Sequence, residues 1–263
     1  MEKKIYQLKL FLFTLINYFC FAIFNILAII FLAPLYFILS LFTIIPYRYT
    51  QILAHPFFKI YILLKPAYKK VYIRDHRKNK PKPTIYIANH QSILDMMIIH
   101  STIKDFLTIA KAKYANFFPL NIAMIVLGAY FLPEKNIACL KGFYDRLPKI
   151  FSLKSSILIF PEGTRMTEEK ISYFKPGAFK FSMDYNIPIT PIVIFGTIHI
   201  LKKNRFIMET NNPENVFISI LQPISPVTFK NIDEFRCYCR HEMEIEYNKL
   251  RNEWHKKSKK NTK

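Results

Sequence analysis

The chain has 263 residues, of which 51% are hydrophobic, and a formal net charge of +20. A chain of this length forms one or two domains with a sizeable core. Its basic residues are spread along the chain without a zinc-finger or RNA-binding motif, which argues against nucleic acid as a partner and favours an anionic membrane or an acidic partner. The four cysteines are scattered, so we predict no disulfide framework and no metal site, and a reducing, cytoplasm-facing compartment.

Residues 1–48 are predicted to anchor the chain in a membrane. No charged residue occurs from Leu10 to Tyr47, a run of 38 positions, whereas roughly 20 residues span a bilayer. Pro34 divides this run into one part long enough to span and one part that is too short. Basic residues flank the run on both sides, which fits a re-entrant hairpin or a single span and places the rest of the chain in the cytoplasm. A secretory signal peptide is the main alternative, but its apolar core is only about 7–15 residues long and ends at a small-residue cleavage site that this run lacks.

Residues 49–83 are predicted to form an amphipathic, basic connector. From Tyr49 to Tyr72, apolar and aromatic side chains are interspersed with lysines, as is typical of a segment that lies along a membrane interface. Residues 74–83 then form a basic, proline-broken loop. We interpret this loop as a solvated turn, which near anionic lipid would also attract the membrane surface.

The rest of the chain alternates between strand-like and helical segments. This alternation predicts an α/β fold, with helices covering a sheet, over residues 84–230, followed by a C-terminal helix and basic tail over residues 231–263. The expected strands are 84–88, 106–110, 128–132, 156–160, 189–195 and 216–221. The expected helices are 93–102, 116–127, 139–147, 177–185 and 232–254.

A first candidate site is the segment 89–95, Asn-His-Gln-Ser-Ile-Leu-Asp, between an expected strand and an expected helix. Residues five apart on a regular helix lie roughly 140° apart around its axis, so His90 and Asp95 can meet only if His90 precedes the helix and Asp95 lies in its first turn. Asp95 would then accept a hydrogen bond from one ring nitrogen of His90 and leave the other as a general base. The alternative is a structural histidine at a strand end and a carboxylate favoured by the helix dipole.

A second candidate site is the segment 160–165, Phe-Pro-Glu-Gly-Thr-Arg, after the fourth expected strand. Pro161 ends the strand because it has no backbone donor, and Gly163 permits a tight turn. Ligands of α/β sheets bind beyond the carboxyl ends of the strands, where Arg165 offers a planar set of donors suited to a phosphate. Taken alone, the segment is equally well a polar turn with a surface ion pair.

The order of these segments resembles the 1-acylglycerol-3-phosphate acyltransferase family. That family has a His-x4-Asp motif, a glycine-containing middle block, a Phe-Pro-Glu-Gly-Thr-Arg motif and a proline-flanked hydrophobic strand, which match residues 90–95, 128–134, 160–165 and 187–194. The resemblance extends across residues 60–225, and the combination of motifs is far more specific than His-x4-Asp alone. It implies a helix-covered mixed sheet of the glycerolipid acyltransferase type, with residues 84–230 as the catalytic domain.

The resemblance also implies a reaction. A fatty acyl group would pass directly from a thioester, acyl-CoA or acyl carrier protein, to the sn-2 hydroxyl of lysophosphatidic acid and give phosphatidic acid. His90 would remove the hydroxyl proton and Asp95 would stabilise the imidazolium. The chain has no Gly-x-Ser-x-Gly motif for an acyl-enzyme serine, and no cofactor is expected beyond the thioester co-substrate. The expected partners are the lysophospholipid acceptor, the thioester donor and membrane lipid.

One position departs from the family's pattern. The middle block commonly ends in an arginine that grips the acceptor phosphate, whereas alignment on Gly128 places Glu134 there, with Lys135 next. A carboxylate does not bind a phosphate, so either Lys135 takes this role or the acceptor is another lysophospholipid, glycerol phosphate or an aminoacyl lipid. A third interpretation, a non-catalytic lipid-binding membrane protein, is disfavoured because such a protein needs no base. The expected substrate-binding residues are Glu162, Gly163, Thr164, Arg165 and Lys135, and the role of Glu162 is either to position the acceptor or structural.

Overall fold

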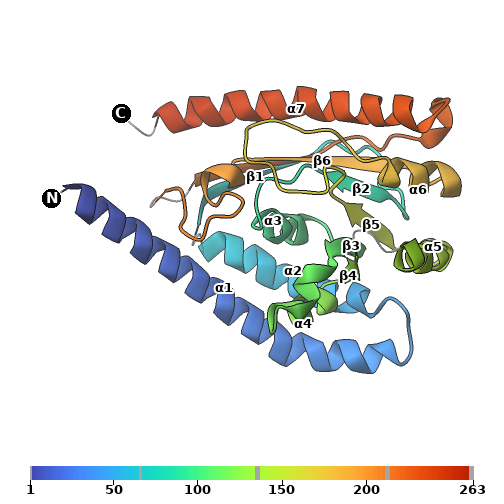
Figure 1. The fold of residues 1–263 in the computed structure, drawn as a ribbon, viewed down its shortest axis with the longest axis horizontal. Coiled ribbons are helices and arrows are strands. Elements are labelled where there is room, and N and C mark those ends of the chain that lie inside the picture. Colours follow the sequence, from blue (N-terminus) through green and yellow to red (C-terminus); the bar gives the residue numbers. More distant parts are fainter. Residues whose placement is uncertain (1, 65–66, 134–136, 211–213, 261–263) are drawn as a thin grey trace.

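A seven-stranded sheet forms the centre of the computed structural model, which describes residues 2–64, 67–133, 137–210 and 214–260 (Figure 1). The strand order is β1-β7-β6-β2-β5-β3-β4. All neighbouring strands run parallel except β6 and β7, so the sheet is mixed, as expected. The strands are β1 (Tyr68–Asp75), β2 (Ile85–Ala88), β3 (Phe106–Lys111), β4 (Ala129–Leu132), β5 (Ser156–Ile159), β6 (Ile189–Phe195) and β7 (Glu214–Ile220).

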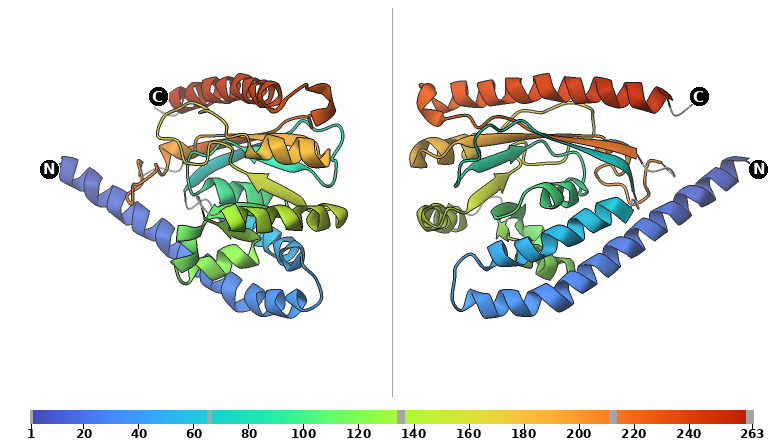
Figure 2. Two further views of the ribbon diagram at one scale, coloured as in Figure 1. Left: turned by 45° about the vertical axis from the view of Figure 1, so that its right-hand side comes forward. Right: turned by 180° about the vertical axis from the view of Figure 1, so that it is seen from behind.

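Helices cover both faces of the sheet (Figures 1 and 2). The C-terminal helix, α7, runs along one face of the sheet against β6 and β7, and α6 packs beside α7. The opposite face is covered by α2 and α3, and α1 packs against α2 and α4 on the outside. The helices are α1 (Glu2–Ser40), α2 (Pro46–Leu64), α3 (Asp95–Thr102), α4 (Leu120–Val126), α5 (Ile137–Ser152), α6 (Gly177–Tyr185) and α7 (Ile232–Lys260), with short 3-10 turns η1 (Ala112–Asn116), η2 (Thr197–His199) and η3 (Pro226–Thr228).

The central strands are buried on both faces, and their side chains divide between two apolar clusters. In β6, Ile192 and Ile194 pack into the cluster beneath α2 and α3, whereas Val193 and Phe195 pack into the cluster beneath α6 and α7. A strand covered on both sides is an uninterrupted apolar run rather than an alternating one. This pattern explains why the predicted bounds of this strand, 189–195, agree with the structure.

The N-terminal segment is one continuous helix rather than two pieces divided at Pro34. The 39-residue α1 passes through Pro34, and the chain turns only after Ser40 before α2 packs back against α1. The α1 helix is long and apolar enough to cross a bilayer, and only 11% of its most apolar window is buried within the protein. An exposed apolar helix of this length fits a membrane-associated protein.

Residues 49–83 are more closely built into the domain than a connector would be. The buried Gln51 of α2 donates hydrogen bonds to the carbonyls of Phe106 and Leu127 and accepts one from the Asp105 amide, each at 2.7 Å. The strand β1 then extends the sheet by pairing with β7. This strand is not evident from the sequence, because β1 lies at an edge and its basic residues Lys69, Lys70 and Arg74 interrupt the apolar ones without a regular alternation.

Candidate active site

The segment that carries the histidine begins at the carboxyl end of β2, in the middle of the sheet. Asn89 follows the strand and is buried, with 1% of its surface exposed. Its side-chain amide donates to the Ile194 carbonyl at 2.9 Å, and its amide oxygen accepts a bond from the Ile194 backbone N–H at 2.8 Å. Asn89 thereby continues the pairing of β2 with β6 beyond the last strand residue and fixes where His90 leaves the sheet.

The predicted contact between His90 and Asp95 is present. His90 lies in the turn before α3, Asp95 is the first residue of that helix, and His90 Nδ1 lies 2.8 Å from Asp95 Oδ2. The same oxygen accepts the backbone N–H groups of Gln91 and Ser92 at 2.7 and 2.9 Å, and Asp95 Oδ1 accepts the Thr197 hydroxyl at 2.6 Å. Because every partner of the buried carboxylate is a donor, His90 carries its proton on Nδ1 and keeps Nε2 as an acceptor.

Thr197 is a part of this arrangement that sequence reasoning missed. It follows β6 and Gly196, whose φ of +111° favours glycine and whose position leaves no room for a Cβ, which would lie 2.4 Å from the Asn215 carbonyl oxygen. The resulting turn places the buried Thr197 hydroxyl beneath Asp95. The signal was available in principle, because Gly196 and Thr197 stand at the carboxyl end of a strand next to β2.

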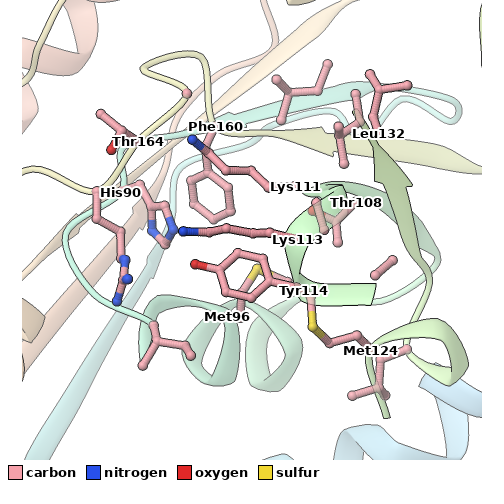
Figure 3. A pocket seen from close by; sticks show the side chains of 18 of the residues that line it. His90, Met96, Thr108, Lys111, Lys113, Tyr114, Met124, Leu132, Phe160 and Thr164 are labelled. Carbon is pink, nitrogen blue, oxygen red and sulfur yellow. The ribbon is translucent and has the colours of Figure 1, made fainter. Parts of the chain in front are cut away.

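The two predicted segments meet at the imidazole ring. The Phe160 ring stacks on the His90 ring with 4.1 Å between centroids and an interplanar angle of 22°. The Met166 backbone N–H donates to the His90 carbonyl at 2.8 Å. The turn from 160 to 166 therefore holds the ring between Phe160 and Asp95, and one fifth of the His90 side chain remains exposed at a cavity (Figure 3).

Within the second segment, Gly163, Thr164 and Arg165 line this cavity. Gly163 adopts a φ of +67°, and a Cβ there would lie 2.8 Å from the Lys175 amine, which crosses directly over the turn. The Thr164 hydroxyl accepts a 2.7 Å hydrogen bond from the Lys203 amine. Two lysines far apart in the sequence thus converge on the turn that carries Arg165.

Glu162 does not line the cavity, although we expected it among the substrate-binding residues. Its side chain is buried and absent from the cavity lining, and its carboxyl group accepts the Ser172 backbone N–H at 3.3 Å. Burial raises the pKa of Glu162 to about 8, and the nearby Asp95 charge adds to this rise, while hydrogen bonds from the Ser172 and His90 backbone partly offset it. Its position is that of a structural group beneath the turn rather than of a group facing a ligand.

The cavity lining near His90, here named the cationic mouth, is strongly cationic. Among the described residues that line the cavity, none is an aspartate or glutamate. Lys135, which we expected to bind substrate, and the neighbouring Glu134 lie outside the described residues. Figure 3 shows Lys111 and Lys113 extending toward the same part of the cavity as His90. The cationic residues of the lining are Lys111, Lys113, Lys175, Lys203 and Arg165.

The remainder of the cavity, whose total volume is about 810 Å³, is mainly apolar. Its walls include residues of α1, α2, α3 and α4, so the apolar N-terminal helix contributes to the same cavity as the site. His100 also lines it but is stacked between Phe58 and Phe106, and burial lowers the pKa of His100 to about 3, so the ring is neutral. Apolar lining residues include Phe21, Phe24, Met96, Leu120, Met124 and Leu132.

A metal centre has no visible basis in the part of the chain that the structure describes. No group of three or more His, Cys, Asp and Glu side chains there is close enough to hold a metal ion. What the geometry offers is an oriented imidazole between a cationic mouth and an apolar pocket. Such an arrangement can accept a proton from a hydroxyl group of a ligand that is anionic at one end and apolar at the other.

The family comparison agrees with this geometry. The sequence model of the family described as Acyltransferase matches residues 70–195, which contain His90, Asp95 and Arg165. Fold and site together define an α/β acyltransferase domain behind an apolar N-terminal helix. Residues 70–195 therefore carry the sequence pattern of the acyltransferase family.

Several relatives carry a more specific name. The chain is 27% identical over 174 residues to the probable 1-acyl-sn-glycerol-3-phosphate acyltransferase of Mycoplasma pneumoniae, covering 62% of this chain and 65% of that protein. It is 31% identical over 168 residues to the 1-acyl-sn-glycerol-3-phosphate acyltransferase of Saccharomyces cerevisiae, covering 62% of this chain and 54% of that protein. The matches therefore span less than two thirds of the length of these relatives.

A solved structure shares the fold over nearly the whole chain. The crystal structure of the 1-acyl-sn-glycerophosphate acyltransferase PlsC from Thermotoga maritima superposes with a TM-score of 0.75. The superposition covers 93% of this chain and 97% of that chain, at 23% sequence identity. The shared architecture therefore includes the N-terminal helices as well as the sheet.

Proposed function

We propose that this protein is a membrane-bound 1-acylglycerol-3-phosphate O-acyltransferase. It would transfer a fatty acyl group from acyl-CoA or acyl carrier protein to the sn-2 hydroxyl of lysophosphatidic acid. The observation that carries the proposal is the position of the His90–Asp95 pair between a cationic mouth and an apolar pocket. A lysophosphatidic acid has a phosphate, a hydroxyl group and an acyl chain in this order, and the cavity offers a complement to each.

In the proposed reaction, His90 Nε2 takes the proton of the acceptor hydroxyl as the oxygen attacks the thioester carbonyl carbon. Asp95 stabilises the imidazolium through its bond to Nδ1, at 2.8 Å. The tetrahedral intermediate then collapses, the C–S bond breaks, and the departing thiolate takes the proton from His90. The products are an ester and a free thiol, and no acyl-enzyme intermediate is needed.

The acceptor phosphate would bind at the cationic mouth. Arg165 supplies a planar fork of donors, and Lys111 and Lys113 approach the same region from the end of β3. Gly163 permits the positive φ of the turn and leaves room for the Lys175 side chain, which brings its amine over the turn. Among the described residues, Arg165, Lys111 and Lys113 are the cations that support phosphate binding.

The proposal also covers co-substrate and location. No cofactor is required beyond the thioester, and the chain's net charge of +20 favours binding of an acidic donor carrier as well as of anionic lipid. Residues 1–48 would hold the site at the bilayer, with the catalytic domain on the cytoplasmic side. Acceptor and product then stay in the membrane throughout the reaction.

A second candidate keeps the chemistry and changes the acceptor. Glu134 stands where the family commonly has a phosphate-gripping arginine. This substitution favours an acceptor whose head group is not a bare phosphate monoester, such as another lysophospholipid or an aminoacyl lipid, and glycerol phosphate is the remaining alternative acceptor.

An acceptor panel separates the candidates. The detergent-solubilised full-length protein is given labelled acyl-CoA or acyl carrier protein, each with lysophosphatidate, glycerol phosphate or lysophosphatidylglycerol. Selective conversion of lysophosphatidate supports the first candidate, and preference for another acceptor supports the second. Absence of transfer with every pair, from protein that remains folded, would favour a non-catalytic lipid-binding protein.

A further inference from the structure

A loop between β6 and β7 projects from a fixed base next to α1. Leu201 and Met208, at its two ends, are each only 4% exposed. The Glu209 backbone N–H donates to the Ile200 carbonyl at 2.9 Å, and the Met208 backbone N–H donates to the Thr14 hydroxyl of α1 at 3.1 Å. Residues 202–207, here named the 202–207 loop, therefore have a defined position beside the apolar N-terminal helix (Figures 1 and 2).

The tip of this loop is apolar and exposed. Phe206 has 84% of its surface exposed, the largest value among the large hydrophobic residues of the part of the chain that the structure describes, and Ile207 is 48% exposed. Lys202, Lys203 and Arg205 stand immediately before them. Lys202 pairs with Glu209 at 3.2 Å. An exposed aromatic side chain next to basic residues matches a phospholipid surface, where acyl chains lie just below a layer of phosphates.

The same loop reaches the candidate active site. The Lys203 amine donates to the Thr164 hydroxyl at 2.7 Å, and Lys203 and Asn204 line the cavity. The exposed apolar surface of α1 continues next to the loop, since α1 carries exposed residues such as Phe11 and Leu15 on both sides of Thr14. One short loop thus lies between the cavity mouth and the apolar surface of α1.

We propose that the 202–207 loop is a membrane-contacting element, in which Phe206 and Ile207 enter the outer part of the lipid leaflet and the adjacent cations bind lipid phosphates. This contact fixes the cavity mouth at the depth of the head groups, where a lysophospholipid enters without leaving the membrane. The kinetic consequence rests on the proposed function, whereas the lipid contact itself does not. A second copy of the chain or an acidic carrier protein is the alternative occupant of the tip.

Fluorescence quenching tests the contact without reference to catalysis. The chain has one tryptophan, Trp254, which is 8% exposed on α7, so wild-type protein gives the background signal. Phe206→Trp is compared with Val227→Trp, because Val227 is 72% exposed on η3, beside α6. Each full-length protein is bound to phosphatidylcholine–phosphatidylglycerol vesicles whose acyl chains carry bromine.

We expect added quenching in Phe206→Trp and none in Val227→Trp. Quenching of Phe206→Trp no stronger than that of the control would overturn the proposal. So would an emission change of Phe206→Trp that follows protein concentration, or addition of acyl carrier protein, instead of lipid.

A kinetic comparison tests the consequence. Phe206→Glu should raise the apparent KM for long-chain lysophosphatidate in vesicles several-fold and leave the KM for a short-chain, water-soluble acceptor unchanged, while Val227→Glu changes neither. An equal effect of Phe206→Glu on both acceptors would contradict a role at the lipid surface. If the wild-type protein acylates neither acceptor while Phe206→Trp is still quenched by lipid, the proposed function fails and the membrane contact stands.

Discussion

The two halves of the candidate site are built in different ways. The histidine turn is fixed by short hydrogen bonds to buried groups, with Asn89 bonded to β6 and Asp95 bonded to four donors. The cationic mouth is assembled from long, partly exposed side chains on separate segments, which include Lys113, Arg165 and Lys203. One of these side chains, Lys203, donates to the Thr164 hydroxyl at 2.7 Å.

This difference separates chemistry from binding. Proton transfer depends on donor and acceptor positions within a few tenths of an ångström, so the side chain of the base must be held in one position. A phosphate is held by several charges whose individual positions matter less, and flexible cations can close around it. Changes in the histidine turn should therefore lower kcat, and changes at the cationic mouth should raise the acceptor KM.

After the loss of His90 itself, the largest fall in kcat is expected for Asp95→Asn. An amide at this position cannot stabilise the imidazolium, and its N–H₂ group opposes the donors of Gln91, Ser92 and Thr197. General acid–base catalysis contributes roughly 10²–10⁴-fold, and we expect kcat to fall within that range. Steady-state kinetics with circular dichroism as a folding check tests this, and a fall in acceptor affinity at constant kcat would contradict the division of roles.

The next effect is expected for Arg165→Ala. Loss of one charge-assisted hydrogen bond to the phosphate costs about 1.5–3 kcal/mol, which corresponds to roughly 10- to 150-fold in acceptor KM. The matched control is Arg146→Ala, which removes an exposed arginine of α5 outside the cavity. The test is the acceptor KM of each variant. Equal KM values for Arg165→Ala and Arg146→Ala would show that Arg165 does not bind the phosphate.

A smaller effect is expected for Thr197→Val. The substitution keeps the shape of the side chain and removes only the 2.6 Å bond to Asp95 Oδ1. Loss of a hydrogen bond to a buried charged group costs about 1–3 kcal/mol, part of which lowers stability. We expect a several-fold lower kcat with an unchanged acceptor KM. The control is Thr228→Val, at an exposed threonine, whose kcat and KM should match those of the wild type.

The smallest effect on turnover is expected for Glu162→Gln, whose main consequence is on stability. Burial raises the pKa of Glu162 to about 8, above its ordinary value in the unfolded chain. Between these two pKa values the folded state binds the proton more tightly, so wild-type stability falls as pH rises toward 8. We expect the melting temperature of Glu162→Gln to fall less between pH 6 and pH 8 than that of the wild type. A parallel fall would show that Glu162 does not titrate in this window.

The sequence was most informative where the cause of the structure is local. The meeting of His90 and Asp95 follows from six consecutive residues and the geometry of one helix start. The strand 189–195 was predicted correctly because burial on both faces leaves a continuous apolar run. Helix 177–185 likewise has the predicted bounds.

Features that depend on distant segments were not predicted. The strand β1 is recognisable only through its pairing with β7, which lies more than 130 residues later. Lys175 and Lys203 reach the site through the fold, and nothing in their neighbourhoods marks them as ligands. Pro34 was expected to divide the N-terminal run, but α1 continues through it. Lys111 and Lys113 could have been found, because they lie at and just after the carboxyl end of β3, a strand of the sheet that carries His90.

The most direct test of the account follows both products of one reaction in wild-type protein and in His90→Ala. Detergent-solubilised protein receives labelled acyl-CoA and lysophosphatidate, and free thiol and acylated lipid are measured over the same time course. We expect equal amounts of thiol and phosphatidate from the wild type, and neither above background from His90→Ala, with the fold and lipid binding retained. Phosphatidate formation by His90→Ala at the wild-type rate would contradict the assignment of His90 as the base.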